Sequence, residues 1–102
     1  MVEAQAAADP PWRVRPLVSL VWHEWPEGSV AFDEVSGQIV EFDPLAAAVM
    51  ACIEAEPVGT SAIAEMLAAD LTQPCDDEFR AVIVGIVEQF HRLGWVDSII
   101  GA

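Results

Sequence analysis

The tripeptide Phe42-Asp43-Pro44 separates two parts of the chain that differ in their periodicity. Short runs of β-forming residues precede it, and apolar residues spaced three or four positions apart follow it. Aspartate is a favoured helix N-cap and proline a favoured first helical residue. A helix is therefore predicted to begin directly after a strand that ends at Phe42. Strands followed by helices are typical of an α+β domain.

Three strands are predicted before this junction, at residues 17–23 (LVSLVWH), 29–33 (SVAFD) and 38–42 (QIVEF). The segments WPEGS and EVSG that separate them contain turn-forming residues, and Gly37 is expected to adopt a positive φ. The second and third runs are close enough in sequence to form a hairpin. The first part of the chain is thus expected to form a small antiparallel sheet.

Three helices are predicted after the junction. The first ends at about residue 55, and the second covers residues 61–70 with Thr60 or Ser61 as its N-cap. The third begins near Asp76, whose charge favours a helix N-terminus, and ends before Gly94, which suits a C-terminal cap. Its apolar residues follow the spacing i, i+3, i+4, i+7; they are Phe79, Val82, Ile83, Ile86, Val87, Phe90 and Leu93. The predicted fold is α+β and winged-helix-like, a three-stranded antiparallel sheet followed by three α-helices.

A chain of 102 residues suits a single domain. We expect residues 1–16 to form a flexible N-terminal tail, residues 17–98 the folded domain and residues 99–102 a C-terminal tail. The segment WVDSII, residues 95–100, is expected to pack back as a short extended tail. The N-terminus lacks the pattern of a signal peptide, and the longest apolar run is too short to span a bilayer. A cytoplasmic location is therefore expected.

The formal net charge is −13, from 17 acidic residues against four basic ones. Proteins that bind nucleic acids need basic surface to displace counterions, and anionic membranes attract basic segments, so this charge disfavours both partners. A basic or neutral protein or peptide is the favoured partner. A charge that only maintains solubility is an equally simple interpretation.

The residues that could carry chemistry do not form a recognisable set. His23 and His91 are the two histidines, and neither they nor the cysteines, Cys52 and Cys75, have the close spacing of metal ligands. Cys52 lies in an apolar run and is expected to be a small buried residue. We therefore expect no enzymatic activity, no metal and no cofactor. Among the tryptophans, Trp22 and Trp95 are assigned to the core, and the other two stay unassigned between core and interface, namely Trp12 and Trp25.

The order of these elements is similar to that of a known family. The hairpin, the junction FDPLAAAVM, the helix TSAIAEML and the ending RLGWV together resemble the PqqD-like peptide chaperones, also called RiPP recognition elements, over roughly residues 17–97. The stretch W-x-x-W-P-E-G-S-V, from Trp22 to Val30, is similar to a bacterial branch of this family found with a kinase related to the HPr kinase.

This resemblance implies a non-catalytic chaperone that captures a precursor or leader peptide by β-strand addition and presents it to a partner modifying enzyme or an HPr-kinase-related protein. In the family the guest peptide pairs with the third strand and packs against the third helix. The residues expected to bind the peptide here are Gln38, Ile39, Val40, Glu41 and Phe42 on the strand, and Phe79, Val82, Ile83 and Ile86 on the helix.

Two other functions remain open at this point. A winged-helix DNA-binding regulator would use the third helix, where Arg80, Gln89, His91 and Arg92 stand among several acidic residues, a poor balance for binding phosphates. A pure adaptor would bind a neighbouring kinase-like enzyme and no peptide. The free edge of the third strand also predicts weak homodimerisation, which Glu41 would oppose through its charge.

Overall fold

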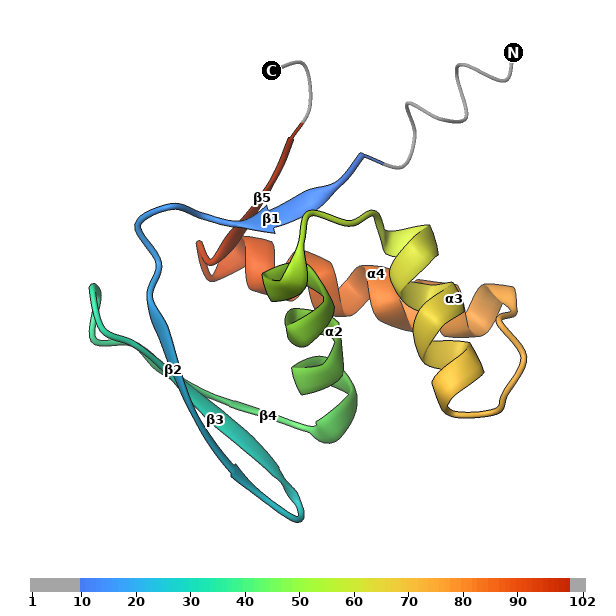
Figure 1. The fold of residues 1–102 in the computed structure, drawn as a ribbon, viewed down its shortest axis with the longest axis horizontal. Helices are drawn as coiled ribbons and strands as arrows, with labels where there is room; N and C mark the ends of the chain where they lie inside the picture. Colours follow the sequence, from blue (N-terminus) through green and yellow to red (C-terminus); the bar gives the residue numbers. More distant parts are fainter. Residues whose placement is uncertain (1–9, 100–102) are drawn as a thin grey trace.

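The computed structural model describes residues 10–99 and has the predicted α+β architecture, a three-stranded antiparallel sheet followed by three helices. Figure 1 shows the sheet on one side of the helices and a second, two-stranded ribbon on the other side. Helix α2 (Pro44–Ala55) lies between these two β-structures, and α3 (Thr60–Asp70) and α4 (Asp77–Arg92) pack beside it (Figure 1). Among the described residues, this arrangement leaves one face of the larger sheet without a covering layer.

The larger sheet has the order β2-β3-β4, with β2 at Leu20–Trp25, β3 at Gly28–Asp33 and β4 at Ile39–Phe42. The two later strands agree with the predicted ones within one residue. The first begins three residues later than predicted, because β3 ends at Asp33, which pairs with Leu20. Residues 17–19 precede this ladder, although the Glu34 N–H still donates to the Ser19 carbonyl at 2.9 Å.

The helices are α2 at Pro44–Ala55, α3 at Thr60–Asp70 and α4 at Asp77–Arg92. Asp43 caps α2 as predicted, because its Oδ1 accepts a hydrogen bond from the Ala46 N–H at 2.8 Å. Asp76 caps α4 in the same way. The prediction that Thr60 or Ser61 caps α3 is wrong. The N-cap is Gly59, whose extended backbone lets its carbonyl accept the first helical hydrogen bond without a side-chain cap.

The prediction that residues 1–16 form a flexible tail is also wrong for part of that range. Strand β1 (Trp12–Val14) pairs antiparallel with β5 (Val96–Ser98), and the Arg15 N–H donates to the Trp95 carbonyl at 3.0 Å. The tripeptide WRV between two prolines is too short to show strand periodicity, and its partner lies more than 80 residues away in the sequence. Residues 1–9 of that tail and residues 100–102 of the C-terminal one lie outside the described part.

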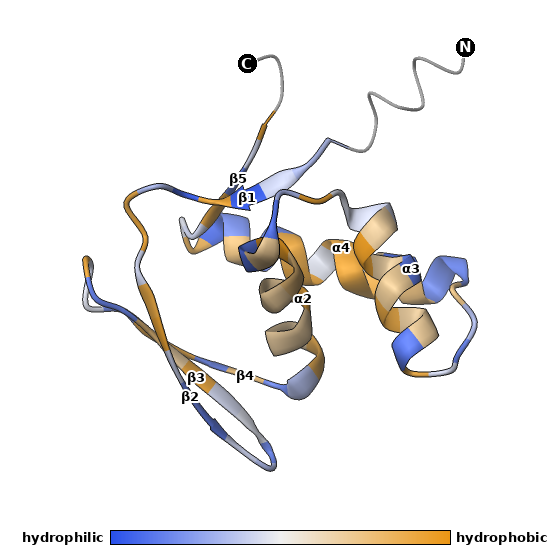
Figure 2. Ribbon diagram, in the orientation of Figure 1, coloured by the Kyte–Doolittle hydropathy of each residue, from blue (hydrophilic) through white to orange (hydrophobic). Residues whose placement is uncertain are grey.

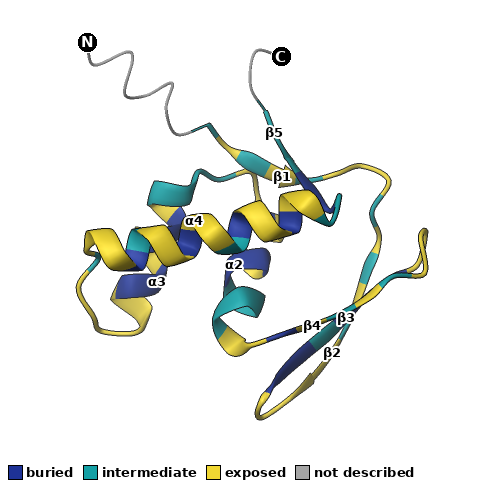
Figure 3. Ribbon diagram, turned by 180° about the vertical axis from the view of Figure 1, so that it is seen from behind, coloured by how far each residue is buried: buried dark blue, intermediate teal, exposed yellow. Residues whose placement is uncertain are grey.

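The core lies where the three helices meet each other and the inner face of the sheet, the face turned toward the helices. Figure 2 shows hydrophobic stretches on all three helices, and Figure 3 shows buried and exposed residues alternating along α4. Trp95 is buried, as predicted, whereas Trp22 is half-buried and donates from its indole nitrogen to Glu54. The buried aliphatic residues of the helices include Val49, Met50, Ile53, Ile63, Leu67, Ile83 and Val87.

Helices α3 and α4 end in the same capping motif with different residues at its left-handed position. Gly94 follows α4 with a φ of 83°, as its predicted capping role requires, and Thr72 follows α3 with a φ of 56°. In both motifs the two closing hydrogen bonds are formed; after α3 they run from Thr72 to Ala69 and from Gln73 to Ala68. A β-branched residue in this conformation is strained, because its Cβ approaches backbone oxygen.

We predict that Thr72→Gly stabilises the protein by about 1 kcal/mol, because glycine removes the left-handed strain and loses only part of that gain to unfolded-state entropy. Gly94→Ala should destabilise by a similar amount. A Cβ at position 94 meets nothing within 4 Å, so that variant reports backbone strain alone. Urea unfolding followed by circular dichroism measures both. Equal destabilisation by the two substitutions would contradict this account of Thr72.

Candidate functional site

Strand β4 lies at an edge of the larger sheet and pairs only with β3 among the described residues. The Asp33 N–H donates to the Gln38 carbonyl, and in the same register Val40 pairs with Ala31 and Phe42 with Ser29. Hydrogen-bonded and non-hydrogen-bonded pairs alternate along an antiparallel ladder. The backbone N–H and C=O groups of the intervening residues, Ile39 and Glu41, are therefore directed away from β3. They form an unpaired row of donors and acceptors.

The side chains of β4 divide between the two faces of the sheet. Val40 and Phe42 face inward and are half-buried and buried, whereas Ile39 and Glu41 are exposed on the outer face, which is turned away from the helices. Gln38 precedes the strand, and its Oε1 accepts a hydrogen bond from the Trp95 indole at 3.1 Å. Gln38 thus fixes the start of β4 against the segment that follows α4.

Phe42 fixes the other end of β4. Its ring meets Phe90 of α4 edge-on, with centroids 5.1 Å apart, and meets Trp95 in the same way at 5.9 Å. Trp22 of β2 adds a tilted contact at 5.4 Å. Phe42 was predicted to bind the peptide, but the ring is 7% exposed and belongs to the core. Its role here is to hold the edge strand in place.

The four helix residues predicted to contact a peptide separate into two groups. Phe79 and Ile83 are buried in the core, so they do not belong to an exposed flank of α4. Val82 is 45% exposed and Ile86 is half-buried. Because residues 79, 83, 87 and 90 all point into the core, positions 82 and 86 lie one step round the helix from the buried stripe. Peptide contact at Val82 and Ile86 stays a prediction.

A network around Asp33 organises the loop that leads into β4. The carboxylate accepts hydrogen bonds from the Ser19 N–H at 3.1 Å, the Val35 N–H at 3.2 Å and the Ser36 hydroxyl at 2.8 Å. The Ser19 N–H is the main cause of a lowered Asp33 pKa, which burial partly opposes and Ser36 and Val35 lower further. Gly37 has a φ of 82° in this loop, as predicted. The ionised Asp33 thus joins the start of β2 to the turn before β4.

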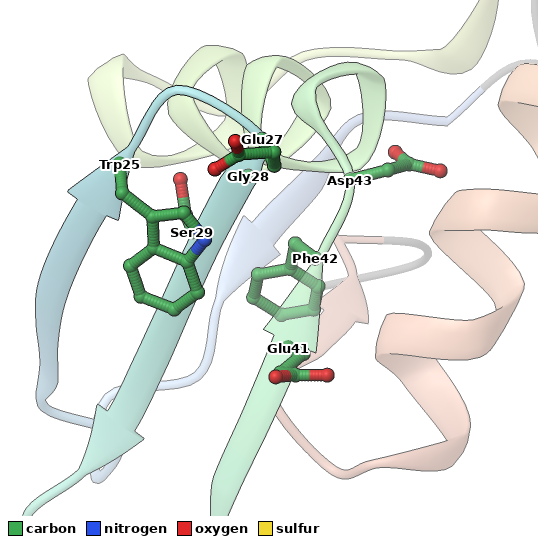
Figure 4. Close-up of a pocket in the computed structure, with 7 residues that line it drawn as sticks. All are labelled: Trp25, Glu27, Gly28, Ser29, Glu41, Phe42 and Asp43. Carbon is green, nitrogen blue, oxygen red and sulfur yellow. The ribbon is translucent and has the colours of Figure 1, made fainter.

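An open pocket of about 410 Å³ lies beside the end of β4, between that strand and the β2–β3 turn (Figure 4). We call it the hairpin pocket. Gly28 leaves space at its base, and a Cβ there would come within 2.6 Å of the Phe42 carbonyl oxygen. Sequence reasoning left Trp25 unassigned and did not associate the acidic residues with a site, because they come from three separate segments. The lining residues are Trp25, Glu27, Gly28, Ser29, Glu41, Phe42 and Asp43.

The outer face of the sheet carries an exposed apolar row next to this pocket. Val21 pairs with Phe32, and Phe32 with Ile39, so the three side chains lie side by side across the strands. All three are exposed, Ile39 most of all at 64%. The neighbouring row, formed by His23, Val30 and Glu41 in the same register, leads toward the hairpin pocket. The β4 edge therefore has apolar character at one end and acidic character at the other.

Other reactive groups of the described residues do not gather into a site. Burial and the nearby Asp70 carboxylate raise the pKa of the Cys52 thiol, which keeps it protonated at neutral pH. Within residues 10–99 no three or more metal-ligating side chains come close enough together to hold a metal ion. None of the helices in that range has the length and apolar character needed to cross a bilayer.

Two of the helix residues considered for DNA binding already contact the protein itself. Arg80 lies 3.8 Å from a carboxylate oxygen of Glu65 on α3. The His91 ring packs edge-on against Trp12, with centroids 5.3 Å apart. The His91 contact engages a side chain that a recognition helix would present to bases, whereas the Arg80 contact is a long ion pair between exposed side chains.

Comparison of the chain with models of known families, with curated proteins and with solved structures finds no match in any of the three. The resemblance to the PqqD-like chaperones therefore stays a prediction, and the function must be argued from the residues.

We predict that Phe42→Ala lowers the unfolding free energy by about 3–5 kcal/mol, because it leaves a cavity between three aromatic rings. Phe32→Ala is the matched control, since it removes the same ring from the outer face of the adjacent strand, and it should cost only about 1 kcal/mol through lost cross-strand contacts. Urea unfolding monitored by tryptophan fluorescence measures both. Similar losses for the two variants would show that Phe42 does not anchor the strand as its contacts indicate.

We also predict a pH-dependent effect of Asp33→Asn. Because the folded-state pKa of Asp33 is lowered, its contribution to stability is present above the unfolded pKa of about 3.9 and is lost as the pH falls through the folded value. The variant should therefore be less stable than the original protein at pH 7, and the difference should disappear in acid. Urea unfolding at a series of pH values measures the difference.

Glu34→Gln, which removes the same charge one position along, controls for the general loss of a negative charge. A stability difference between Asp33→Asn and the original protein that is independent of pH would contradict the role given to the carboxylate.

Proposed function

We propose that this protein is a non-catalytic peptide-binding chaperone that captures an extended precursor or leader peptide at the free edge of β4 and presents it to a partner enzyme. The guest adds as a fourth strand beside β4. Backbone hydrogen bonds supply affinity, and side-chain contacts on the two faces supply selectivity.

One observation carries this proposal, the outward-directed backbone groups of Ile39 and Glu41. Strand edges of this kind pair readily with other chains, and proteins commonly protect them with covering segments, proline or bulges. Within residues 10–99, β4 has none of these along Ile39–Phe42, and the strand is anchored at both ends, by Gln38 and by Phe42. A rigid, uncovered edge does not have to be ordered when a guest binds, which favours affinity.

The last helix, α4, supports the same site. Phe42 packs on Phe90 of α4, and in Figure 4 α4 lies beyond the side of β4 that faces away from β3. Val82 and Ile86 offer apolar surface on that helix. A guest strand would have polar main-chain contacts on one side and an apolar helix flank on the other. An HPr-kinase-related protein or another modifying enzyme is the proposed recipient of the peptide.

We predict that Ile39→Pro lowers peptide affinity at least about tenfold, because proline removes an outward N–H and leaves the β3–β4 hydrogen bonds intact. Glu24→Pro is the matched control. By the same alternation the Glu24 N–H is directed outward on β2, at the opposite edge of the sheet. Isothermal titration with a precursor peptide encoded beside the gene measures both, and circular dichroism checks the fold.

The location is tested by following amide resonances during the titration. Shifts at residues 38–42 and along the Val82–Ile86 flank are expected. Equal loss of affinity in the two proline variants, or shifts confined to the β2 edge, would overturn the β4 site. Association with duplex DNA that weakens steeply with salt would instead favour a regulator. Binding of the neighbouring enzyme without any peptide would favour a pure adaptor.

A further inference from the structure

The carboxylates of the hairpin pocket have no cationic partner within residues 10–99. Glu27 comes from the β2–β3 turn, Glu41 from β4 and Asp43 from the N-cap of α2. The ion pairs found in this range lie elsewhere, between β1 and β5 and between α3 and α4. One Asp43 oxygen accepts the capping hydrogen bond, and the other oxygens stay available. Three carboxylates around one pocket create a negative local potential that favours a cation.

An exposed tryptophan makes this pocket more than an acidic cluster. Trp25 is 40% exposed, and in Figure 4 its ring lies on the pocket side of the hairpin. An indole face attracts ammonium and especially guanidinium groups. Ser29 also lines the pocket; it is 6% exposed and pairs with Phe42, so its side chain lies on the inner face of the sheet.

The register of the sheet places this pocket against one end of the proposed guest strand. On the outer face, a guest residue beside Ile39 would extend the apolar row of Val21 and Phe32. The guest residue two positions away would face Glu41 and approach Asp43. Neighbouring side chains on one face of a strand are always two positions apart. A guest strand that runs in the opposite direction therefore places the same two kinds of residue beside Ile39 and Glu41, in the reverse order along the guest.

From this arrangement we infer the chemical class of the guest: a strand with an arginine or lysine two positions from an aliphatic residue on its outer face. The basic residue lies against Glu41 and Asp43 and extends toward Trp25, and the aliphatic residue lies against Ile39. This inference rests on the proposed strand addition at β4. It agrees with the overall charge of −13, which attracts a basic segment from a distance.

The probes are synthetic nine-residue peptides of alternating valine and threonine that differ only in the central residue, arginine or glutamate. The arginine peptide should bind about tenfold more tightly at low salt, the equivalent of two or three exposed charge contacts. This ratio should shrink as salt is added. In the double variant Glu27→Lys/Glu41→Lys the preference should reverse in favour of the glutamate peptide. Asp43 is left in place because it caps α2.

The matched control is Glu56→Lys/Glu88→Lys, which changes the net charge by the same amount at exposed positions outside the pocket. It should keep the preference for arginine. Equal affinities for the two peptides, or the same change of preference in both double variants, would overturn the inferred guest class and leave strand addition standing. If neither peptide at millimolar concentration shifts the amide resonances of Ile39 and Glu41, the proposed function itself fails.

Discussion

The packing of Phe42 is the contact on which the rest of this structure depends. The residue ends β4, and its ring joins β2, α4 and the segment after α4 through Trp22, Phe90 and Trp95. The next residue caps α2, so strand and helix meet without a flexible loop. Burying an aromatic ring stabilises by a few kcal/mol, whereas the short β4 strand alone contributes little. The position of the edge strand is therefore determined by the core.

Sequence signals correctly predicted those features of the fold that depend only on residues within about one helical turn. Asp43 and Gly94 act within one helical turn, and both have the predicted roles. The apolar spacing of α4 follows from its burial along one side, so the helix was predicted within about one residue. The family resemblance assigned Phe79 and Ile83 of this helix to peptide contact, but both are buried. Periodicity shows which residues share a face. Which part of that face another element covers depends on packing that the spacing does not contain.

The features that sequence reasoning missed all depend on contacts between distant segments. Strand β1 exists because β5 lies beside it, and Thr72 adopts a left-handed conformation because the chain must turn between two packed helices. The hairpin pocket joins a turn, a strand and a helix cap. The one available signal was Trp25, a large aromatic residue beside a two-residue turn, whose role depends on Gly28 leaving space opposite it.

The same carboxylate that would select a guest also disfavours pairing of two copies at the β4 edge. Two copies of β4 could pair edge to edge as antiparallel strands related by a two-fold axis. Only the residues with outward backbone groups, Ile39 and Glu41, could then form the hydrogen-bonded pairs between the copies. In the two registers with the most overlap, Glu41 of one copy lies opposite either Ile39 or Glu41 of the other copy. One sets a charge against an aliphatic side chain and the other sets two like charges together, and both arrangements cost free energy. A guest with a basic residue at this position would avoid both costs, which favours the proposed guest over a second copy of this chain at the β4 edge.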